Sequence, residues 1–143
     1  MYKSHHPLSA WNFETYLLSE RGTETEAREA TTMDLQLWHS AAALSGIAAI
    51  GLGAYGAFGF KPEDPTYKEV WLTASLYHLV HTAALLAAPI AKHPTLFGGL
   101  LAAGILAFSG TYYAVAFLED RKYLKLALFG GFVFIAAWGS LLF

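Results

Sequence analysis

The 143-residue sequence contains no cysteine and few charged residues. Without thiols, the chain cannot form disulfide bonds, thiolate metal sites or a cysteine nucleophile. Charged residues make up 14% of the chain and hydrophobic residues 55%, whereas an ordinary soluble domain is about 25% charged. The formal net charge of −2 offers no basic surface to nucleic acid. These shortages exclude a disulfide scaffold, a disordered chain and a nucleic-acid-binding protein, and they predict an integral membrane protein.

The few charges are concentrated in short parts of the chain. Residues 1–37 hold nine of the 20 formal charges (nine basic plus eleven acidic), and the others lie near 61–69, near 119–125 and at Lys92. A helix of about 20 uncharged residues crosses a hydrocarbon core of roughly 30 Å. Four stretches without Asp, Glu, Lys or Arg are therefore candidate membrane spans: 38–60, 70–91, 93–118 and 126–143.

Proline and capping residues refine the limits of these spans. Asp64-Pro65 is a typical cap and first turn, and Pro94 opens the third stretch. Residues 38–143 are therefore predicted to form one four-transmembrane-helix domain in contact with the lipid bilayer. The predicted fold is an all-α integral membrane four-helix bundle, with helices at about 38–60, 65–90, 94–118 and 125–143.

Residues 1–37 form a different kind of segment. The stretch from 19 to 29 is polar and acidic and lacks a hydrophobic stripe. A secretory signal needs a basic start and an apolar core, and a mitochondrial presequence is rich in Arg and poor in acids, so neither fits. We expect a polar, acidic arm that is disordered or only loosely ordered on the surface. Met33, just before the first span, raises the hypothesis that translation also starts there, which would make residues 1–32 dispensable.

The first span contains the pattern G-x-G-x-x-G at Gly51, Gly53 and Gly56. A dinucleotide site needs a strand before this pattern, a helix opening at it and an acidic residue about 20 positions later. A charge-free span offers none of these, so we expect no nucleotide binding. Small residues instead recur every four positions, as at Ser45 and Ala49, and such a face lets another helix approach closely.

The predicted helix-packing residues are small residues from three spans: Ser45, Ala49, Gly53, Gly56, Ala57, Gly99, Ala103 and Gly131. Two uses of these surfaces remain open. They can pack the four helices into one compact bundle, or one of them can form the interface of a homo-oligomer.

The second span carries the polar chemistry of the membrane domain. At 1.5 Å per residue, His78 lies about 20 Å beyond residue 65, near the bilayer midplane. His81 is three residues further on and shares its face. Ionisable groups at this depth usually face the bundle interior and have a partner. The candidate intramembrane polar site therefore combines residues of the second and third spans: Ser75, Tyr77, His78, His81, Thr82, Ser109 and Tyr113.

Three interpretations of the two histidines remain open. Neutral imidazoles can hydrogen-bond to Ser or Tyr across helices, they can form a proton or ion relay, or they can bind a metal or haem. Two histidines on one helix face cannot take both axial positions of a haem. Zinc would need a third ligand, and no Asp, Glu or Cys lies at that depth. We therefore expect no metal and no cofactor.

No catalytic set is recognisable in the sequence. The spans contain no pair of carboxylates, and the acids of the loops alternate with Lys and Arg, as solvated faces do. Serines without a base of suitable geometry are not nucleophiles. The sequence therefore predicts that the protein is not an enzyme.

Three stretches resemble the transmembrane protein 256 family, which is related to bacterial inner-membrane proteins of the domain of unknown function 423. They are LSG at 44–46, LGAYGAFG at 52–59 and TASLYHLVHTAALL at 73–86. The resemblance covers about 38–143 and implies a small multi-pass helical protein without an assigned activity. It also makes the mitochondrial inner membrane a candidate compartment. Tyr77 and His81 match the family, whereas Phe58 stands where the family often has His.

Taken together, these patterns predict a non-enzymatic, small multi-pass membrane protein. We expect a structural or assembly component, or an accessory subunit of a membrane complex, whose partners are other membrane proteins or a second copy. The alternative is a small transporter or proton-conducting element that uses the face of His78 and His81 with Ser109 or Tyr113.

Overall fold

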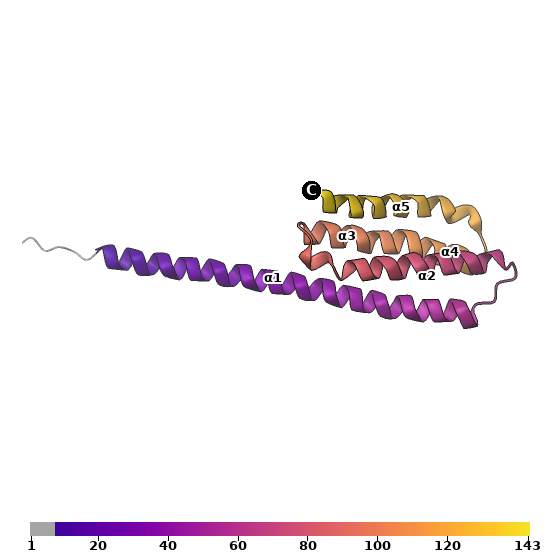
Figure 1. The fold of residues 1–143 in the computed structure, drawn as a ribbon, viewed down its shortest axis with the longest axis horizontal. Coiled ribbons are helices and arrows are strands. Elements are labelled where there is room, and N and C mark those ends of the chain that lie inside the picture. The colour runs from indigo at the N-terminus through magenta and orange to yellow at the C-terminus, as the bar shows by residue number, and fades with distance from the viewer. Residues whose placement is uncertain (1–7) are drawn as a thin grey trace, which may run out of the picture. The chain divides into compact units, whose positions relative to one another are not determined.

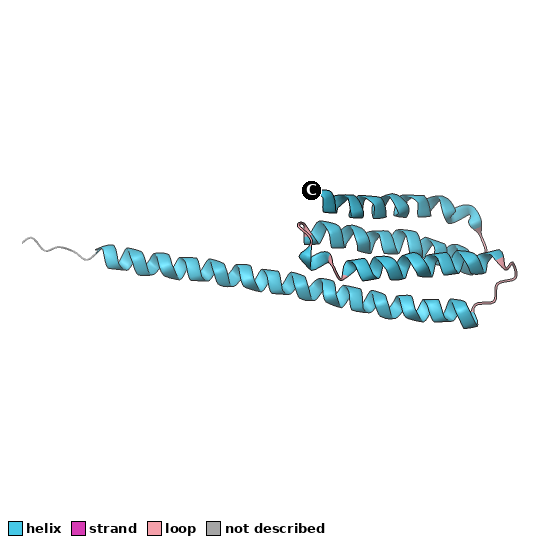
Figure 2. Cartoon of the chain, in the orientation of Figure 1, coloured by secondary structure: helices cyan, strands magenta, loops and turns pink. Residues whose placement is uncertain are grey.

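A computed structural model describes residues 8–143, with side chains from residue 12 onward. Every regular element in this range is helical (Figure 2). The chain divides into two compact units, Met1–Met33 and Asp34–Phe143. The α-helices of the described range, labelled in Figure 1, are α1 (Leu8–Ala54), α2 (Thr66–Leu85), α3 (Pro94–Gly104), α4 (Gly110–Leu118) and α5 (Leu124–Gly139).

The first unit contains the N-terminal part of α1. The predicted disorder of residues 1–37 is wrong for residues 8–37, which are helical. Glu, Ala, Leu and Arg favour helices, and no proline lies between Pro7 and Pro62. Residues 1–7 of the predicted arm lie outside the described range. Four threonine hydroxyls donate to backbone carbonyls three or four positions earlier: Thr23, Thr25, Thr31 and Thr32.

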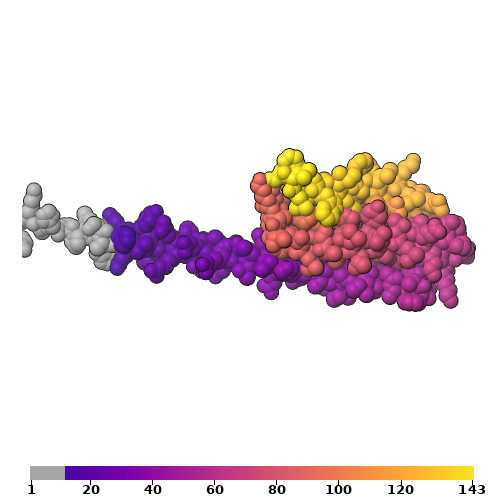
Figure 3. Space-filling view, in the orientation of Figure 1, coloured from indigo at the N-terminus to yellow at the C-terminus, as the bar shows by residue number. Residues whose placement is uncertain are grey.

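The second unit is a four-helix bundle, as predicted. Its first helix, the part of α1 from Asp34, ends in a π turn, η1 (Tyr55–Gly59). Its third helix runs from α3 to α4 through a second π turn, η3 (Ile105–Ser109). α2 packs along α4 and η3, whereas α5 packs along α3 and η3 (Figure 1). In the space-filling view, α5 lies directly against α3 and α4 (Figure 3). The 3₁₀ turns are η2 (Ala88–Ile90), η4 (Arg121–Tyr123) and η5 (Ser140–Leu142).

α2 differs in composition from the other helices of the bundle. It carries Lys68 and Glu69 near its start and two histidines further along. Both imidazoles are buried, each residue being 6% exposed, and a polar side chain of a membrane helix costs least when it faces the bundle interior. Three helical stretches of the described range are long and apolar enough to cross a membrane: Asn12–Gly59, Pro94–Leu118 and Arg121–Leu142. α2, which corresponds to the predicted span 65–90, is not among them.

All buried positions of α2 except Thr82 follow a seven-residue repeat. Their steps alternate between four and three residues: Tyr67, Trp71, Ala74, His78, His81 and Leu85. The first helix of this unit, from Asp34 of α1 through η1, has the same spacing at six buried or half-buried positions: Trp38, Ala42, Ser45, Ala49, Leu52 and Gly56. A repeat of 3.5 residues per turn keeps one stripe of a helix against its neighbour over several turns. We call these two stripes the seam; both histidines of α2 belong to it.

Glycines allow the closest helix contacts in the interior. The tightest positions of the described range are Gly56, Gly98, Gly104 and Gly130. A Cβ atom on Gly56 would stand 2.2 Å from the ring of Trp71, and one on Gly130 would stand 2.4 Å from the backbone nitrogen of Phe108. Since real Cβ atoms do not approach this closely, only glycine lets these helices pack as they do.

The predicted packing residues divide into two groups. Ala49 and Gly56 are buried in the seam and Ser45 is half-buried, whereas the others point outward or make little contact: Gly53, Ala57, Gly99, Ala103 and Gly131. The predicted four-residue step explains the difference along α1. Each such step turns about 40° around the helix, so the predicted stripe leaves the interface, whereas alternating steps of four and three residues stay on it.

Glu119 joins the two loops at one end of the bundle. It ends α4 in the left-handed conformation, with φ of 51°. Its carboxylate accepts hydrogen bonds from the backbone N–H groups of Glu63, at 3.0 Å, and Asp64, at 3.3 Å. Arg121 also donates to the Thr66 hydroxyl at 2.9 Å. The start of α2 is therefore fixed to the end of α4, and this sets the register in which their polar side chains meet.

Candidate functional site

His78 lies between hydroxyl groups from two neighbouring helices. Its Nε2 is 3.1 Å from the Ser45 hydroxyl of α1, and its Nδ1 is 3.5 Å from the Tyr113 hydroxyl of α4. Ser45 is also 2.6 Å from the Thr82 hydroxyl, and Tyr113 donates to the Ser75 hydroxyl at 3.2 Å. These five side chains form one hydrogen-bonded chain across the bundle, here called the His78 network.

The partners of His78 do not fix its tautomer. A hydroxyl group can donate or accept a hydrogen bond, whereas a neutral imidazole has one donor and one acceptor nitrogen. With Tyr113 donating to Ser75, it accepts from His78 and the imidazole proton is on Nδ1. The proton can be on Nε2 instead only if Tyr113 turns its own proton from Ser75 to Nδ1 and Ser45 accepts from Nε2. The chain ends at a backbone group, because the Ser75 hydroxyl donates to the Trp71 carbonyl at 3.1 Å.

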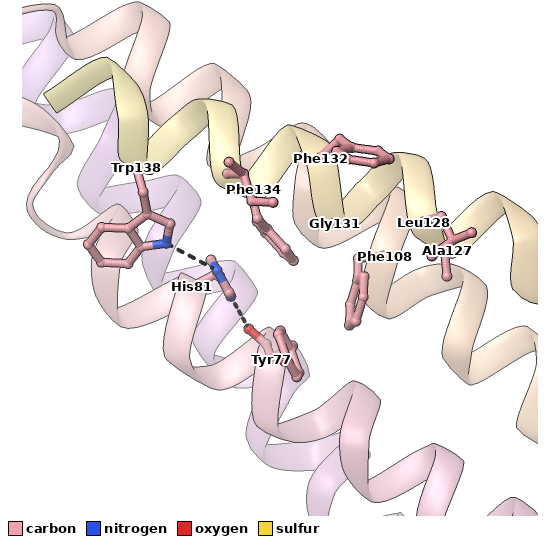
Figure 4. A pocket seen from close by; sticks show the side chains of 10 residues that line it. Tyr77, His81, Phe108, Ala127, Leu128, Gly131, Phe132, Phe134 and Trp138 are labelled. Atoms are coloured by element: carbon pink, nitrogen blue, oxygen red, sulfur yellow. Dashed lines mark hydrogen bonds between the residues drawn. The ribbon is translucent and has the colours of Figure 1, made fainter. Parts of the chain in front are cut away.

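His81, one turn further along α2, has partners with fixed roles. Its Nδ1 lies 2.7 Å from the backbone carbonyl of Tyr77, which can only accept. Its Nε2 receives the indole N–H of Trp138 at 3.3 Å (Figure 4), and an indole can only donate. His81 is therefore neutral, with its proton on Nδ1. A proton on Nε2 would place two donors against each other.

The His81 ring also lies in an aromatic group between α2 and α5. It stacks on Phe134 with ring centroids 3.5 Å apart and an interplanar angle of 14°, and more distantly on Tyr77, with centroids 5.9 Å apart. Tyr77 in turn packs against Phe108 of η3 at 4.6 Å. Figure 4 shows these rings around an open space between the two helices.

That space is an apolar pocket of about 420 Å³, here called the His81 pocket. α2 and η3 contribute Tyr77, His81 and Phe108, and α5 contributes seven residues: Ala127, Leu128, Gly131, Phe132, Phe134, Ile135 and Trp138. Pockets of this size that are mainly apolar, with a few converging polar groups, are typical of small-molecule sites.

Six of the seven predicted polar-site residues belong to these two arrangements. Ser75, His78, Thr82 and Tyr113 form the His78 network, and Tyr77 and His81 line the pocket. Ser109 belongs to neither the His78 network nor the His81 pocket. It is 1% exposed, and its hydroxyl has no hydrogen-bond partner among residues 12–143.

Sequence reasoning missed two partners. Ser45 was predicted as a packing residue rather than a polar partner of His78, although its place in the seven-residue repeat of α1 would have signalled it. Trp138 was not predicted at all, and its distance of 57 positions from His81 along the chain left no local signal.

The described residues contain no group of three His, Cys, Asp or Glu side chains that could hold a metal ion. Both nitrogens of His81 are already engaged with Tyr77 and Trp138. The chemistry that the arrangement offers is therefore hydrogen bonding, through a rearrangeable chain at His78 and a fixed, neutral imidazole at His81.

Residues 52–131 match the family described as a protein of unknown function (DUF423). A UPF0382 membrane protein of Schizosaccharomyces pombe is 33% identical over 120 residues, which cover 76% of this chain and 99% of the relative. The UPF0382 membrane protein YwdK of Bacillus subtilis is 32% identical over 104 residues, covering 67% of this chain and 85% of YwdK. No solved structure matches the chain. The matched range contains both buried histidines and Tyr113, but neither Ser45 nor Trp138.

Proposed function

The chain belongs to the DUF423 family and is a small multi-pass membrane protein; from this premise we propose that it is a non-enzymatic structural or assembly component, or an accessory subunit, of a membrane complex. One observation carries this proposal. Several small residues that the sequence offers for close packing are not used inside the bundle. No atom lies within 4 Å of a Cβ placed on Gly53 or Gly99, and Ala57 and Ala103 are exposed.

Such open small positions suit a helix of another membrane protein. In lipid, helices associate through close packing of small residues, since apolar side chains gain little from leaving a solvent that is itself apolar. The buried histidines and Thr82, in contrast, already have hydrogen-bond partners within the bundle. This leaves association through the outer surface as the function best supported.

Native electrophoresis of the full chain, extracted from its own membrane with a mild detergent, tests the proposal. The mitochondrial inner membrane, implied by the family resemblance, is the first membrane to examine. We expect migration in a complex that contains other membrane proteins, and a shift to the free species in a Gly53→Leu/Gly99→Leu variant. Gly139→Leu is the matched control, because its Cβ also meets nothing within 4 Å. Migration of the wild-type chain only as a free small species would contradict the proposal.

A second candidate function, proton conduction, is favoured by the His78 network. Thr82, Ser45, His78, Tyr113 and Ser75 form a continuous chain of groups that can each donate and accept. A chain of this kind can pass protons when its groups rotate in turn. The test is pH-dependent proton flux in reconstituted vesicles. The candidate predicts flux in the wild-type protein, none in His78→Phe and retained flux in His81→Phe. Equal flux in the His78 variant, or none in the wild type, would eliminate it.

A further inference from the structure

We propose that the His81 pocket binds a lipid dissolved in the bilayer whose planar ring bears a carbonyl oxygen, that is, a quinone-type headgroup. The ring would lie among the aromatic side chains, and its carbonyl would accept a hydrogen bond from the Tyr77 hydroxyl. This inference does not depend on the proposed function, because the pocket lies between α2 and α5 and includes neither Gly53 nor Gly99.

The pocket lies at a depth that a lipid-soluble molecule reaches from the side. Tyr77 is eleven residues after the start of α2 and eight before its end, so it stands about 16 Å from one end and about 12 Å from the other. The rim on α5 is formed by exposed apolar side chains, with Phe132 and Ile135 each 67% exposed. Entry is therefore from hydrocarbon rather than from water.

The Tyr77 hydroxyl is the feature that selects the ligand. Tyr77 is hydrogen-bonded through its backbone carbonyl, and no partner of its hydroxyl is found among the residues that the structure describes. A hydroxyl at mid-membrane depth is costly without an acceptor. A saturated acyl chain has no acceptor to offer, whereas a ring carbonyl has one. The unmet donor therefore favours a carbonyl-bearing ligand over an ordinary lipid tail.

The walls of the pocket favour a flat ring. Tyr77, Phe108, Phe134 and Trp138 present aromatic rings to it (Figure 4), and aromatic rings pack well in offset or edge-to-face contacts. The His81 imidazole is held in place by Tyr77 and Trp138, so the wall is already formed without a ligand. Because both His81 nitrogens are engaged, the site is one of binding, and no transfer of electrons or protons to the ring is implied.

An adjoining cavity suits the tail of such a lipid. It measures about 260 Å³ and is lined by residues of α2, α3 and the segments beside them, including Ala84, Phe97 and Leu141. Trp138 borders both this cavity and the His81 pocket. A ligand with its ring in the larger space would place a chain of several carbon atoms in this cavity by passing Trp138.

Tryptophan fluorescence of the detergent-solubilised full chain provides the test. The probes are decyl-benzoquinone, whose ring carries carbonyl groups, and decylbenzene, which has the same tail and no carbonyl. We expect saturable quenching by the quinone, above the linear background from partition into micelles. In competition with decyl-benzoquinone, decylbenzene should bind the site at least tenfold more weakly than the quinone does.

Three variants locate the site. Gly131→Leu should abolish saturable binding, because a Cβ there makes only ordinary contact, 3.9 Å from the Phe108 ring, and the rest of the side chain fills the pocket. Gly139→Leu, on the same helix with nothing within 4 Å of its Cβ, should bind like the wild type. Tyr77→Phe should weaken quinone binding about tenfold and leave decylbenzene competition unchanged, as expected for the loss of one hydrogen bond.

Three results would overturn the inference. Purely linear quenching in the wild-type protein would show partition alone. Equal saturable binding in Gly131→Leu and Gly139→Leu would place the ligand elsewhere. Equal competition by decylbenzene and the quinone would identify the occupant as an ordinary hydrocarbon chain. Circular dichroism and the elution volume of each variant establish that it is folded. If Gly131→Leu does not fold, Tyr77→Phe, which keeps the ring, replaces it as the variant that tests the site.

Discussion

His78 and His81 are the same residue type on the same helix face, three residues apart, yet their surroundings are opposite in kind. Around His78 the partners are hydroxyls from α1 and α4, which can each donate or accept. Around His81 one partner is a carbonyl and the other an indole, so their roles cannot change. Burial alone, 6% exposure in both cases, does not distinguish the two.

The difference shows that the neighbouring helix, through the partners it supplies, determines whether the hydrogen bonds of a buried histidine can rearrange. α1 and α4 meet His78 with small or reorienting polar groups, and the result is a rearrangeable chain. α5 meets His81 with Phe134 and Trp138, which immobilise the ring and leave an apolar pocket beside it. Changes on α5 should therefore affect His81 and leave His78 largely unchanged, and the converse should hold for α1 and α4.

The largest effect is expected from Gly130→Ala. The new Cβ would stand 2.4 Å from the backbone nitrogen and 2.7 Å from the Cα of Phe108, and a backbone cannot move aside as a flexible side chain can. α5 must shift away from η3, which costs about 1–3 kcal/mol or more of the free energy of unfolding. Because Phe134 and Trp138 lie on α5, NMR signals of His81 should shift strongly and those of His78 weakly.

Thermal unfolding in detergent and histidine-selective NMR measure these two results for Gly130→Ala. Gly139→Ala is the control on the same helix, since its Cβ meets no atom within 4 Å, and it should change neither the melting temperature nor the spectra. Equal shifts at both histidines in Gly130→Ala would show that the two regions are coupled through α2 and not independent.

The four-helix bundle could be predicted because its causes are local. Long uncharged stretches and prolines lie in the sequence itself, and the resemblance to the transmembrane protein 256 and DUF423 proteins is confirmed by the family match at residues 52–131. The helical state of residues 8–37 was missed, because the lack of a hydrophobic stripe was read as disorder although Glu, Ala and Leu favour a helix.

The sequence predicted the residues of the site on α2 and Tyr113 on α4, but not the partners on α1 and α5. Spacing on α2 placed His78 and His81 on one face, but their partners depend on the register of helices far away in sequence. Ser45 is 33 positions from His78 and Trp138 is 57 from His81. That register is set by contacts such as Gly56 against Trp71, which no local pattern reveals.

An intermediate effect is expected from Ser45→Ala, which acts on the His78 side. The change removes the hydroxyl at His78 Nε2 and leaves Tyr113 as the remaining partner at Nδ1. Because Tyr113 donates to Ser75, it accepts from His78, and the tautomer with the proton on Nδ1 is then favoured. The change also removes the hydrogen bond to the Thr82 hydroxyl. The cost in stability is therefore about 1–2 kcal/mol, the usual size of two hydrogen bonds between membrane helices.

Nitrogen-15 chemical shifts of labelled histidines in nanodiscs report the two tautomers. In the wild-type protein, His81 should show only the Nδ1–H form and His78 a mixture. Ser45→Ala should convert His78 to one form without changing His81. Trp138→Phe is the matched change on the other side: it removes a donor from His81, whose tautomer should persist because the Tyr77 carbonyl still accepts. A single tautomer of His78 in the wild type would contradict this assignment.

The smallest effect is expected in the loops, which differ from both histidine regions in carrying carboxylates. Hydrogen bonds from the Thr66 backbone N–H and hydroxyl lower the pKa of Asp64 below its ordinary value of 3.8. The side chain and backbone N–H of Lys122 lower the pKa of Asp120 in the same way. A lowered pKa means that the stabilisation is present above pH 3.8 and is lost as the pH falls through the lower folded value.

Hydrogen exchange of the Thr66 and Lys122 amides, which donate to these carboxylates at 2.9 and 3.0 Å, should therefore stay slow down to about pH 4 and accelerate below it, after correction for the intrinsic pH dependence of exchange. Asp64→Asn and Asp120→Asn should each remove the pH step at one amide only. Both carboxylates are exposed, so screening by water keeps the effect local. The hydrogen bonds of Ser45 to His78 and of Trp138 to His81 should be unaffected over this pH interval. If they also weakened, the loops and the buried histidines would form one cooperative unit. The two histidine regions would then not be independent of each other.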